Sequence, residues 1–303
     1  MNNKRLLNHI PNKTAIRGFS ILEFLVASLL SMIVLMAVSS TYFTARGLNK
    51  SANTRIGIQQ DLRNAANMIV RDARMAGNFG CFNMANFPAS AVIEDKSSDE
   101  YALKTAGVNN LLPVKEINEL SYTGFAKTGN DPIPVFQYGI DKENPAAKTA
   151  IVSSCSGIIK LDNLDNLNTA KLTLAKSGQE GSIAIMKHEM IAYAVGKLGK
   201  EIGLFRFQLS DDGSWNNPQL LIKDIESMKI HYFYANCSDA PNASASATSE
   251  ENFVRADKLD ISPEAKSPAS IQIVLNGGSI DSSTEKDNKV DIYNINATIR
   301  GGN

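Results

Sequence analysis

The sequence is poor in the residue groupings on which catalytic and metal sites depend. Its 303 residues include only three histidines, His9, His188 and His231, and they are scattered along the chain. It contains no Gly-x-Ser-x-Gly elbow, no phosphate-binding glycine-rich loop and no His-Glu-x-x-His motif. His188 and His231 fall in expected strands, where a structural histidine is the better interpretation. The sequence therefore predicts no enzyme, and it suggests no cofactor or metal.

Net charge is also absent, because 31 Lys and Arg residues balance 31 Asp and Glu residues. A neutral chain is a poor candidate for broad electrostatic binding to nucleic acid or to an anionic membrane surface. The acidic run Asp211-Asp212-Gly213 lacks the spaced ligands of a calcium loop, so we expect a turn there. The three cysteines, Cys81, Cys155 and Cys237, match no zinc-binding spacing.

What the sequence does contain is one long apolar run, residues 19–43, with a single charge at Glu23. As a helix, this run is long enough to cross the hydrocarbon core of a bilayer. Lys4, Arg5, Lys13 and Arg17 precede it, and this positive charge should keep the N-terminus cytoplasmic and send the rest of the chain across. A carboxylate in hydrocarbon is costly, so Glu23 is a functional candidate.

The residues around the start of this run, Gly18-Phe19-Ser20-Ile21-Leu22-Glu23, resemble the type III signal of prepilins. The family usually has Thr at the position of Ser20. The resemblance implies cleavage after Gly18, N-methylation of Phe19 and retention of the apolar helix. No Ala-x-Ala pattern follows the run, as it would in a secretory signal peptide that is removed with its apolar region.

The helical pattern continues well beyond the apolar run. Apolar residues recur at steps of three and four from Ile58 to Ala76, and charged residues, Asp72 among them, are expected on the other faces. Gly77 is the expected stop. The sequence thus predicts one helix over residues 20–76, roughly 85 Å long at 1.5 Å per residue.

The remainder predicts a head made mainly of strands. Strand patterns are clear in five segments, residues 182–195, 202–209, 226–234, 271–275 and 291–299. Residues 83–148 contain several prolines and should be mostly loop with short strands, and residues 161–174 give no clear pattern. Residues 238–250 are low in complexity and should form a loop.

The segment from Arg71 to Cys81, with its Arg-Met-Ala-Gly run and Gly80-Cys81, resembles the end of the long helix in PilW-type minor pilins. This resemblance implies an α+β fold in which a long helix packs on an antiparallel sheet. It divides the chain into a leader (1–18), a transmembrane helix (19–46), a periplasmic half-helix (47–80) and a β-rich periplasmic head (81–303). The chain would sit in the inner membrane before assembly and in a pilus at the cell surface afterwards.

The resemblance also implies a role and partners. The role is that of a low-abundance minor pilin that helps prime assembly of a type IV pilus, which in turn supports twitching, adhesion or DNA uptake. Glu23 would set the register between subunits by pairing with the amine of Phe19 on a neighbour. The partners would be other minor pilins, the major pilin, a prepilin peptidase, an inner-membrane assembly platform and a tip adhesin. Direct binding of nucleic acid is not expected.

The cysteines would lie in an oxidising compartment, where one disulfide and one free thiol are expected. We expect Cys81 to pair with Cys155, which would tie the end of the long helix to the sheet. A Cys155–Cys237 pair stays open as an alternative.

Two other functions also stay open, a minor pseudopilin of a type II secretion system and a membrane-anchored periplasmic enzyme or binding domain.

Overall fold

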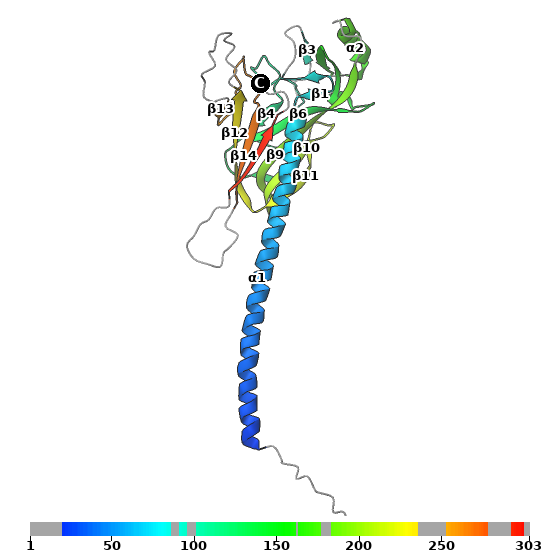
Figure 1. Ribbon diagram of the computed structural model, residues 1–303. Helices are drawn as coiled ribbons and strands as arrows, with labels where there is room; N and C mark the ends of the chain where they lie inside the picture. The colour runs from blue at the N-terminus through cyan, green and yellow to red at the C-terminus, as the bar shows by residue number, and fades with distance from the viewer. Residues whose placement is uncertain are drawn as a thin grey trace, which may run out of the picture. The chain divides into compact units, whose positions relative to one another are not determined.

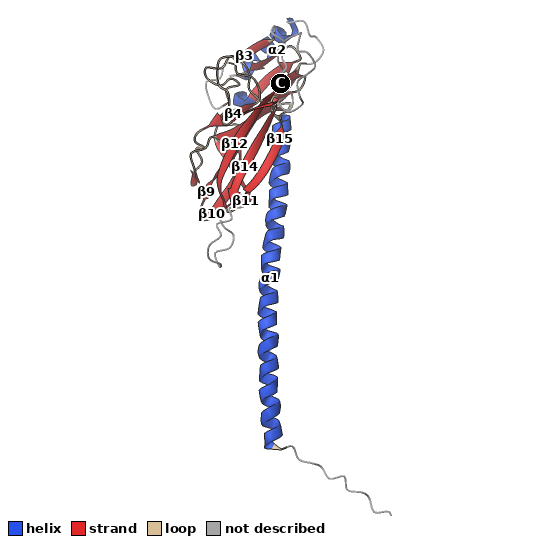
Figure 2. Cartoon of the chain, turned by 60° about the vertical axis from the view of Figure 1, so that its left-hand side comes forward, coloured by secondary structure: helices blue, strands red, loops and turns tan. Residues whose placement is uncertain are grey.

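The computed structural model describes residues 20–85, 91–95, 101–161, 163–176, 183–235, 253–277 and 292–299. A long N-terminal helix is followed by sheets that are mainly antiparallel, so the α+β fold expected from the sequence is confirmed (Figures 1 and 2). The chain divides into two compact units, residues 1–57 and 58–303. The helix continues across their boundary, and the two units are described separately below.

The long helix, α1, runs from Ile21 to Met75. An acidic residue, Glu23, lies in its first turn and a basic residue, Arg74, in its last, which is the favourable arrangement for the helix dipole. The helix ends at a glycine, as expected, because Gly77 adopts a φ of 77° that disfavours other residues. A Cβ at Gly77 would also lie 2.9 Å from the Cβ of Pro113.

The larger sheet of the second unit has nine strands arranged around β9 (Ala184–Leu198). This strand pairs with β5, β6, β7 and β10, and every pair in the sheet is antiparallel except β3 with β8. The other strands are β3 (Val92–Asp95), β4 (Val114–Ile117), β5 (Phe125–Lys127), β6 (Ile133–Asp141), β7 (Ala150–Ser154), β8 (Gly157–Lys160), β10 (Glu201–Leu209) and β11 (Trp215–Lys223).

A second sheet has four strands in the order β13-β12-β14-β15, all antiparallel. They are β12 (Ile225–Ala235), β13 (Phe253–Ala256), β14 (Ser270–Gly277) and β15 (Ile292–Thr298). The chain passes from the first sheet to the second at Asp224, whose φ of 57° separates β11 from β12. A two-stranded ribbon, β1 (Asn78–Phe79) and β2 (Phe82–Asn83), follows α1 directly. The single sheet expected from the sequence is therefore three sheets.

Two parts of the head differ from the sequence prediction. Within residues 83–148, expected to be mostly loop, β6 is a nine-residue strand with a buried centre. Pro134 suggested an interruption of any strand here, but it lies near the start of β6, before the pairing with β9 begins at Val135. Proline lacks a backbone N–H, and this is tolerated at that position. Helical turns η1 (Ala147–Thr149) and η2 (Leu164–Asn166) and helix α2 (Leu167–Lys176) were also not predicted.

The core of the second unit lies between the end of α1 and the two larger sheets. Ala65, Ile69 and Ala73 of α1 are fully buried there, as is Ala76, which directly follows the helix. They belong to one apolar cluster with residues of both sheets, among them Ile191 and Tyr193 of β9, Ile230 of β12, Ile273 of β14 and Ile295 of β15. Three of these four residues are alanine, and their small side chains let the end of the helix approach the sheets closely.

Candidate assembly interface and the helix–head junction

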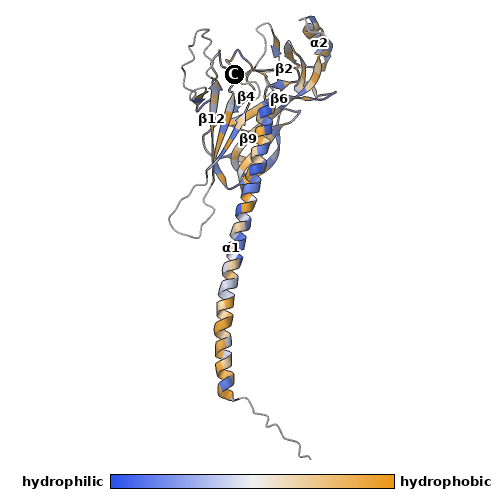
Figure 3. Ribbon diagram, in the orientation of Figure 1, coloured by the Kyte–Doolittle hydropathy of each residue, from blue (hydrophilic) through white to orange (hydrophobic). Residues whose placement is uncertain are grey.

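The N-terminal part of α1 is an exposed apolar helix. Its large side chains from Ile21 to Phe43 are each more than half exposed, and none of the described residues of the first unit is buried. Figure 3 shows α1 changing from mainly hydrophobic at its N-terminal end to mainly hydrophilic further along. The helix is long and apolar enough to cross a membrane, which is consistent with single-pass anchoring.

The polar side chains within this apolar segment differ in whether they have a hydrogen-bond partner. The hydroxyls of Ser28, Ser31 and Thr41 donate to backbone carbonyls of their own helix at 2.8–3.0 Å, so they cost little in an apolar environment. The carboxylate of Glu23, in the first turn, has no hydrogen-bond or ion-pair partner within the described part of the chain, whereas its backbone N–H donates to the Ser20 carbonyl. It is the only charged side chain from Ser20 to Ala45. This carboxylate is therefore available for a group outside the described residues.

The other two residues of the expected processing site, Gly18 and Phe19, lie outside the described residues, as does the whole leader. Cleavage after Gly18, methylation of Phe19 and the register role of Glu23 accordingly stay predictions.

The junction between α1 and the head is built around one buried carboxylate, Asp72. Its Oδ2 atom accepts hydrogen bonds from the Tyr193 hydroxyl at 2.7 Å and from Arg206 Nε at 3.0 Å. Its Oδ1 atom accepts from Arg71 Nη2 at 3.2 Å and from the Tyr138 hydroxyl at 3.4 Å. Asp72 is fully buried, so these bonds replace the water that both oxygens lose on folding.

This finding corrects the sequence analysis, which placed Asp72 on a polar face of the helix. The buried residues Ala65, Ile69 and Ala73 follow one face in steps of four, and Asp72 lies seven residues after Ala65 on that same face. A charged residue in register with an apolar stripe was the signal that could have identified it. Its partner Arg206 could not have been found from spacing, because β10 is 134 positions further along the chain.

The charges of this junction shift the pKa values of its members. Burial raises the pKa of Tyr138 and Tyr193, and the adjacent negative charge of Asp72 raises both further. Burial acts to lower the pKa of Arg206, but Asp72 outweighs that effect and the pKa is raised overall. Both tyrosines therefore stay protonated and Arg206 stays charged, which keeps the four-residue network intact at neutral pH.

A second polar network lies beside the first. Glu189 of β9 is 2% exposed, accepts a hydrogen bond from Gln208, and pairs with Lys187 at 3.2 Å. Lys187 also pairs with Asp211 at 3.1 Å. Burial raises the pKa of Glu189 despite the opposing effect of Lys187. The network joins β9 to β10 and ends at the surface, at Asp211.

The two histidines of the described residues lie in strands, as expected. His188 of β9 is fully buried and its Nε2 lies 3.1 Å from Gln137 Oε1, and burial lowers its pKa well below the usual value. His231 of β12 lies at the surface with Nδ1 2.7 Å from Asp257. The two rings belong to different sheets, and each has its own structural partner.

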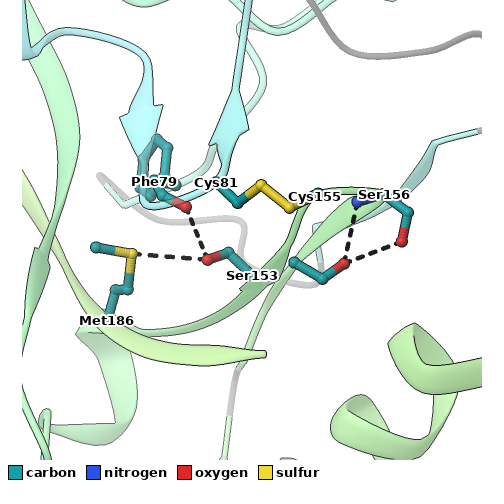
Figure 4. Close-up of a disulfide and its surroundings, with 7 residues drawn as sticks. Phe79, Cys81, Ser153, Cys155, Ser156 and Met186 are labelled. Atoms are coloured by element: carbon teal, nitrogen blue, oxygen red, sulfur yellow. Dashed lines mark hydrogen bonds between the residues drawn. A yellow bond between two sulfur atoms is a disulfide. The ribbon is translucent and has the colours of Figure 1, made fainter. Parts of the chain in front are cut away.

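A disulfide joins Cys81 to Cys155, with the two Cα atoms 4.7 Å apart. This is the pairing expected in the sequence analysis, and Cys237 lies outside the described residues. Figure 4 shows the bond next to the ribbon that follows α1, where Ser153 donates a hydrogen bond of 2.8 Å to the Phe79 carbonyl. The disulfide therefore connects the chain just past the end of α1 to the turn between β7 and β8.

The side-chain interactions described above hold the end of α1 and the strands of the head against one another. Within the described ranges, no group of three or more His, Cys, Asp or Glu residues could hold a metal ion. No protein-family model, curated protein or solved structure matches the chain. What the structure does show, a long apolar N-terminal helix joined to a β-rich head, is compatible with a pilin-like layout.

Proposed function

We propose that this chain is a minor pilin of the PilW type, a low-abundance subunit that primes the assembly of a type IV pilus. One observation carries the proposal. An exposed apolar helix with a single carboxylate in its first turn continues without a break into a helical segment that packs on a β-rich head. Among the residues that the structure describes, none covers the apolar surface of this helix, so that surface is suited to lipid and then to the helices of other subunits.

Glu23 supplies the specificity of that packing. An unpaired carboxylate in hydrocarbon is costly, whereas a carboxylate paired with an amine on a neighbouring subunit is compensated. Cleavage after Gly18 would create such an amine at Phe19, four residues before Glu23. Subunits would then be stable side by side only when the amine of one lies level with Glu23 of the next, which fixes their axial register.

The size of the head favours a place at the fibre tip. The second unit contains three sheets and a further helix in addition to the end of α1. A head of this size would crowd its neighbours if it were repeated at every step of a fibre, whereas a tip subunit has nothing stacked above it. A tip subunit also enters first, so it would lower the barrier to bringing the first helices together in the membrane.

This function requires a defined set of partners and locations. The chain would be held in the inner membrane with its head in the periplasm, processed by a prepilin peptidase and passed to an inner-membrane assembly platform. It would then contact other minor pilins, the major pilin and a tip adhesin in the pilus.

Deletion of the gene tests the proposal. We expect the number of surface pili to fall sharply while the pool of major pilin in the membrane persists, and the few remaining pili to keep their normal diameter. Complementation with a Gly18→Val variant should fail, because a side chain at the cleavage site should leave the precursor uncut. Normal pilus numbers in the deletion strain would contradict the proposal. If secretion through a secretin pathway stopped instead, the chain would be a minor pseudopilin.

A further inference from the structure

The segment of α1 that follows the apolar run carries three cations and no acid. Arg46, Lys50 and Arg55 are exposed, and no acidic residue occurs on the helix between Glu23 and Asp61. Arg46 and Lys50 are four residues apart, so they lie on one face, where two like charges repel and destabilise an isolated helix. The whole chain is neutral, but this stretch has a net charge of +3 from three cations and no anion. An anionic partner would relieve the repulsion.

The position of these cations along the helix indicates what the partner is. Glu23 and Arg46 are 23 residues apart, which is about 35 Å along a helix and slightly more than the roughly 30 Å thickness of a hydrocarbon core. An anchor with Glu23 near its inner boundary therefore places Arg46 just beyond the outer boundary, at the depth of the lipid phosphates. Lys50 follows about one turn further on, on the same face, and Arg55 lies about 13 Å beyond Arg46 on the opposite face.

Two aromatic residues mark the same boundary independently. Tyr42 and Phe43 lie directly before the cations, with ring centroids 5.8 Å apart, and both side chains are exposed. Aromatic side chains, Tyr and Trp above all, are enriched where a transmembrane helix leaves the hydrocarbon. The aromatic pair and the cations thus indicate the same position along α1 for the outer surface of the membrane.

We propose that Arg46 and Lys50 on one face of α1, together with Arg55 on the opposite face further out, bind the phosphate-bearing headgroups of anionic phospholipids on the outer surface of the membrane. The inference rests on the proposed function, in which the chain is first inserted in the membrane. It further names the class of lipid that the inserted chain binds and the residues that select it. Binding would hold the outer end of the anchor at the phosphate level until the subunit is drawn into the fibre. Each cation near a charged surface contributes about a fivefold increase in affinity, and this contribution weakens as salt is added.

The test is a lipid-selectivity measurement on the full chain. Protein reconstituted in vesicles of 70% phosphatidylcholine and 30% phosphatidylglycerol is recovered in limiting detergent, and the ratio of the two co-purifying lipids is measured. The wild-type chain should be several-fold enriched in phosphatidylglycerol. The triple variant Arg46→Gln, Lys50→Gln, Arg55→Gln should return to the bulk ratio. A control with equal charge loss on exposed head residues, Lys197→Gln, Lys200→Gln, Lys229→Gln, should keep the wild-type enrichment.

Each other outcome overturns the inference in a distinguishable way. Equal enrichment in the wild type and the triple variant, with both resistant to alkaline extraction, would refute the headgroup site and leave the membrane anchor standing. If both proteins were removed from the vesicles by alkaline extraction, the anchor and the headgroup site would fail together. If the triple variant kept its lipid preference but no longer entered fibres, the cations would pair with carboxylates of a neighbouring subunit instead.

Discussion

At the residue scale, the carboxylate of Asp72 brings together three elements that are far apart in the sequence. Tyr138, Tyr193 and Arg206 reach it from β6, β9 and β10, and each hydrogen bond also limits how α1 can rotate or slide on the sheet. A buried ion pair of this kind is weak evidence for stability as such, because desolvation offsets much of the attraction between the charges. Its role here is to specify one packing arrangement of the helix.

Removing Asp72 should therefore be strongly destabilising, because Arg206 would keep a buried charge without a partner. We expect Asp72→Ala to lower the free energy of unfolding by about 3–5 kcal/mol. Asp61→Ala, an exposed position on the same helix, is the matched control and should change it by less than about 0.5 kcal/mol. Urea unfolding followed by the fluorescence of Trp215, the only tryptophan and a buried one, measures both. Equal effects of the two variants would show that the buried network does not stabilise the junction.

Three buried tyrosines predict a loss of stability at high pH. Burial raises the pKa of Tyr138, Tyr193 and Tyr232, with Asp72 or the hydrogen-bonded Glu116 raising them further. The native state then holds protons that the unfolded state releases above about pH 10. The stabilisation is fully present below pH 10 and is lost as the pH rises, by about 1.4 kcal/mol per pH unit for each tyrosine.

Unfolding free energies measured between pH 9 and 11 test this expectation. Tyr193→Phe removes one titrating group, so its stability should decline less steeply with pH than that of the wild type. Identical slopes for the two proteins would show that Tyr193 ionises as freely in the native state as in the unfolded chain.

At the scale of elements, α1 and the strands show which parts of the fold are local and which are not. The helix from Ile21 to Met75 was predictable to within a residue or so, because periodicity and the glycine stop are properties of neighbouring residues. The strand β6 was not predicted, because Pro134 suggested a loop in that segment. The separation into two large sheets depends on the backbone conformation at Asp224, which the pattern of apolar and polar residues does not indicate. The Asp72–Arg206 pair could not be predicted from the sequence, because only the tertiary fold brings these two residues together.

The apolar half of α1 carries the prediction closest to the proposed function. Glu23→Val should insert into the membrane at least as well as the wild type, since it removes a charge from an apolar helix. It should nevertheless enter fibres poorly, because the pairing with the amine of Phe19 is lost. Ser31→Val is the matched control, because the Ser31 hydroxyl is bonded within the helix. Fibre incorporation of the Glu23 variant at the wild-type level would refute its role in register.

The disulfide connects two elements, and its contribution can be measured separately. It joins residues 74 positions apart in the sequence, and a loop of that length contributes about 4 kcal/mol of stability when the entropy of the unfolded chain dominates. We expect the double variant Cys81→Ala, Cys155→Ala to lose stability of this order, measured against Cys237→Ala, which should behave as the wild type. Peptide mapping without reduction checks the connectivity, and a bridged peptide that contains Cys237 would contradict it.

At the scale of the whole molecule, two units with different surroundings are joined in one helix. The first has no buried residue among those described, whereas the second contains several buried apolar clusters, and the end of the helix belongs to one of them. An apolar surface left open over the length of a membrane span needs other molecules to cover it. We therefore expect the chain to move from lipid to a bundle of like helices, and its head to be the part that other proteins meet.

Mass spectrometry of fibres sheared from the cell surface tests this account most directly. It predicts that the fibres contain this chain at low abundance relative to the main subunit, with an N-terminus at Phe19 that carries a methyl group. Fibres that lack the chain altogether, with the full-length protein still beginning at Met1 and confined to the membrane, would contradict it.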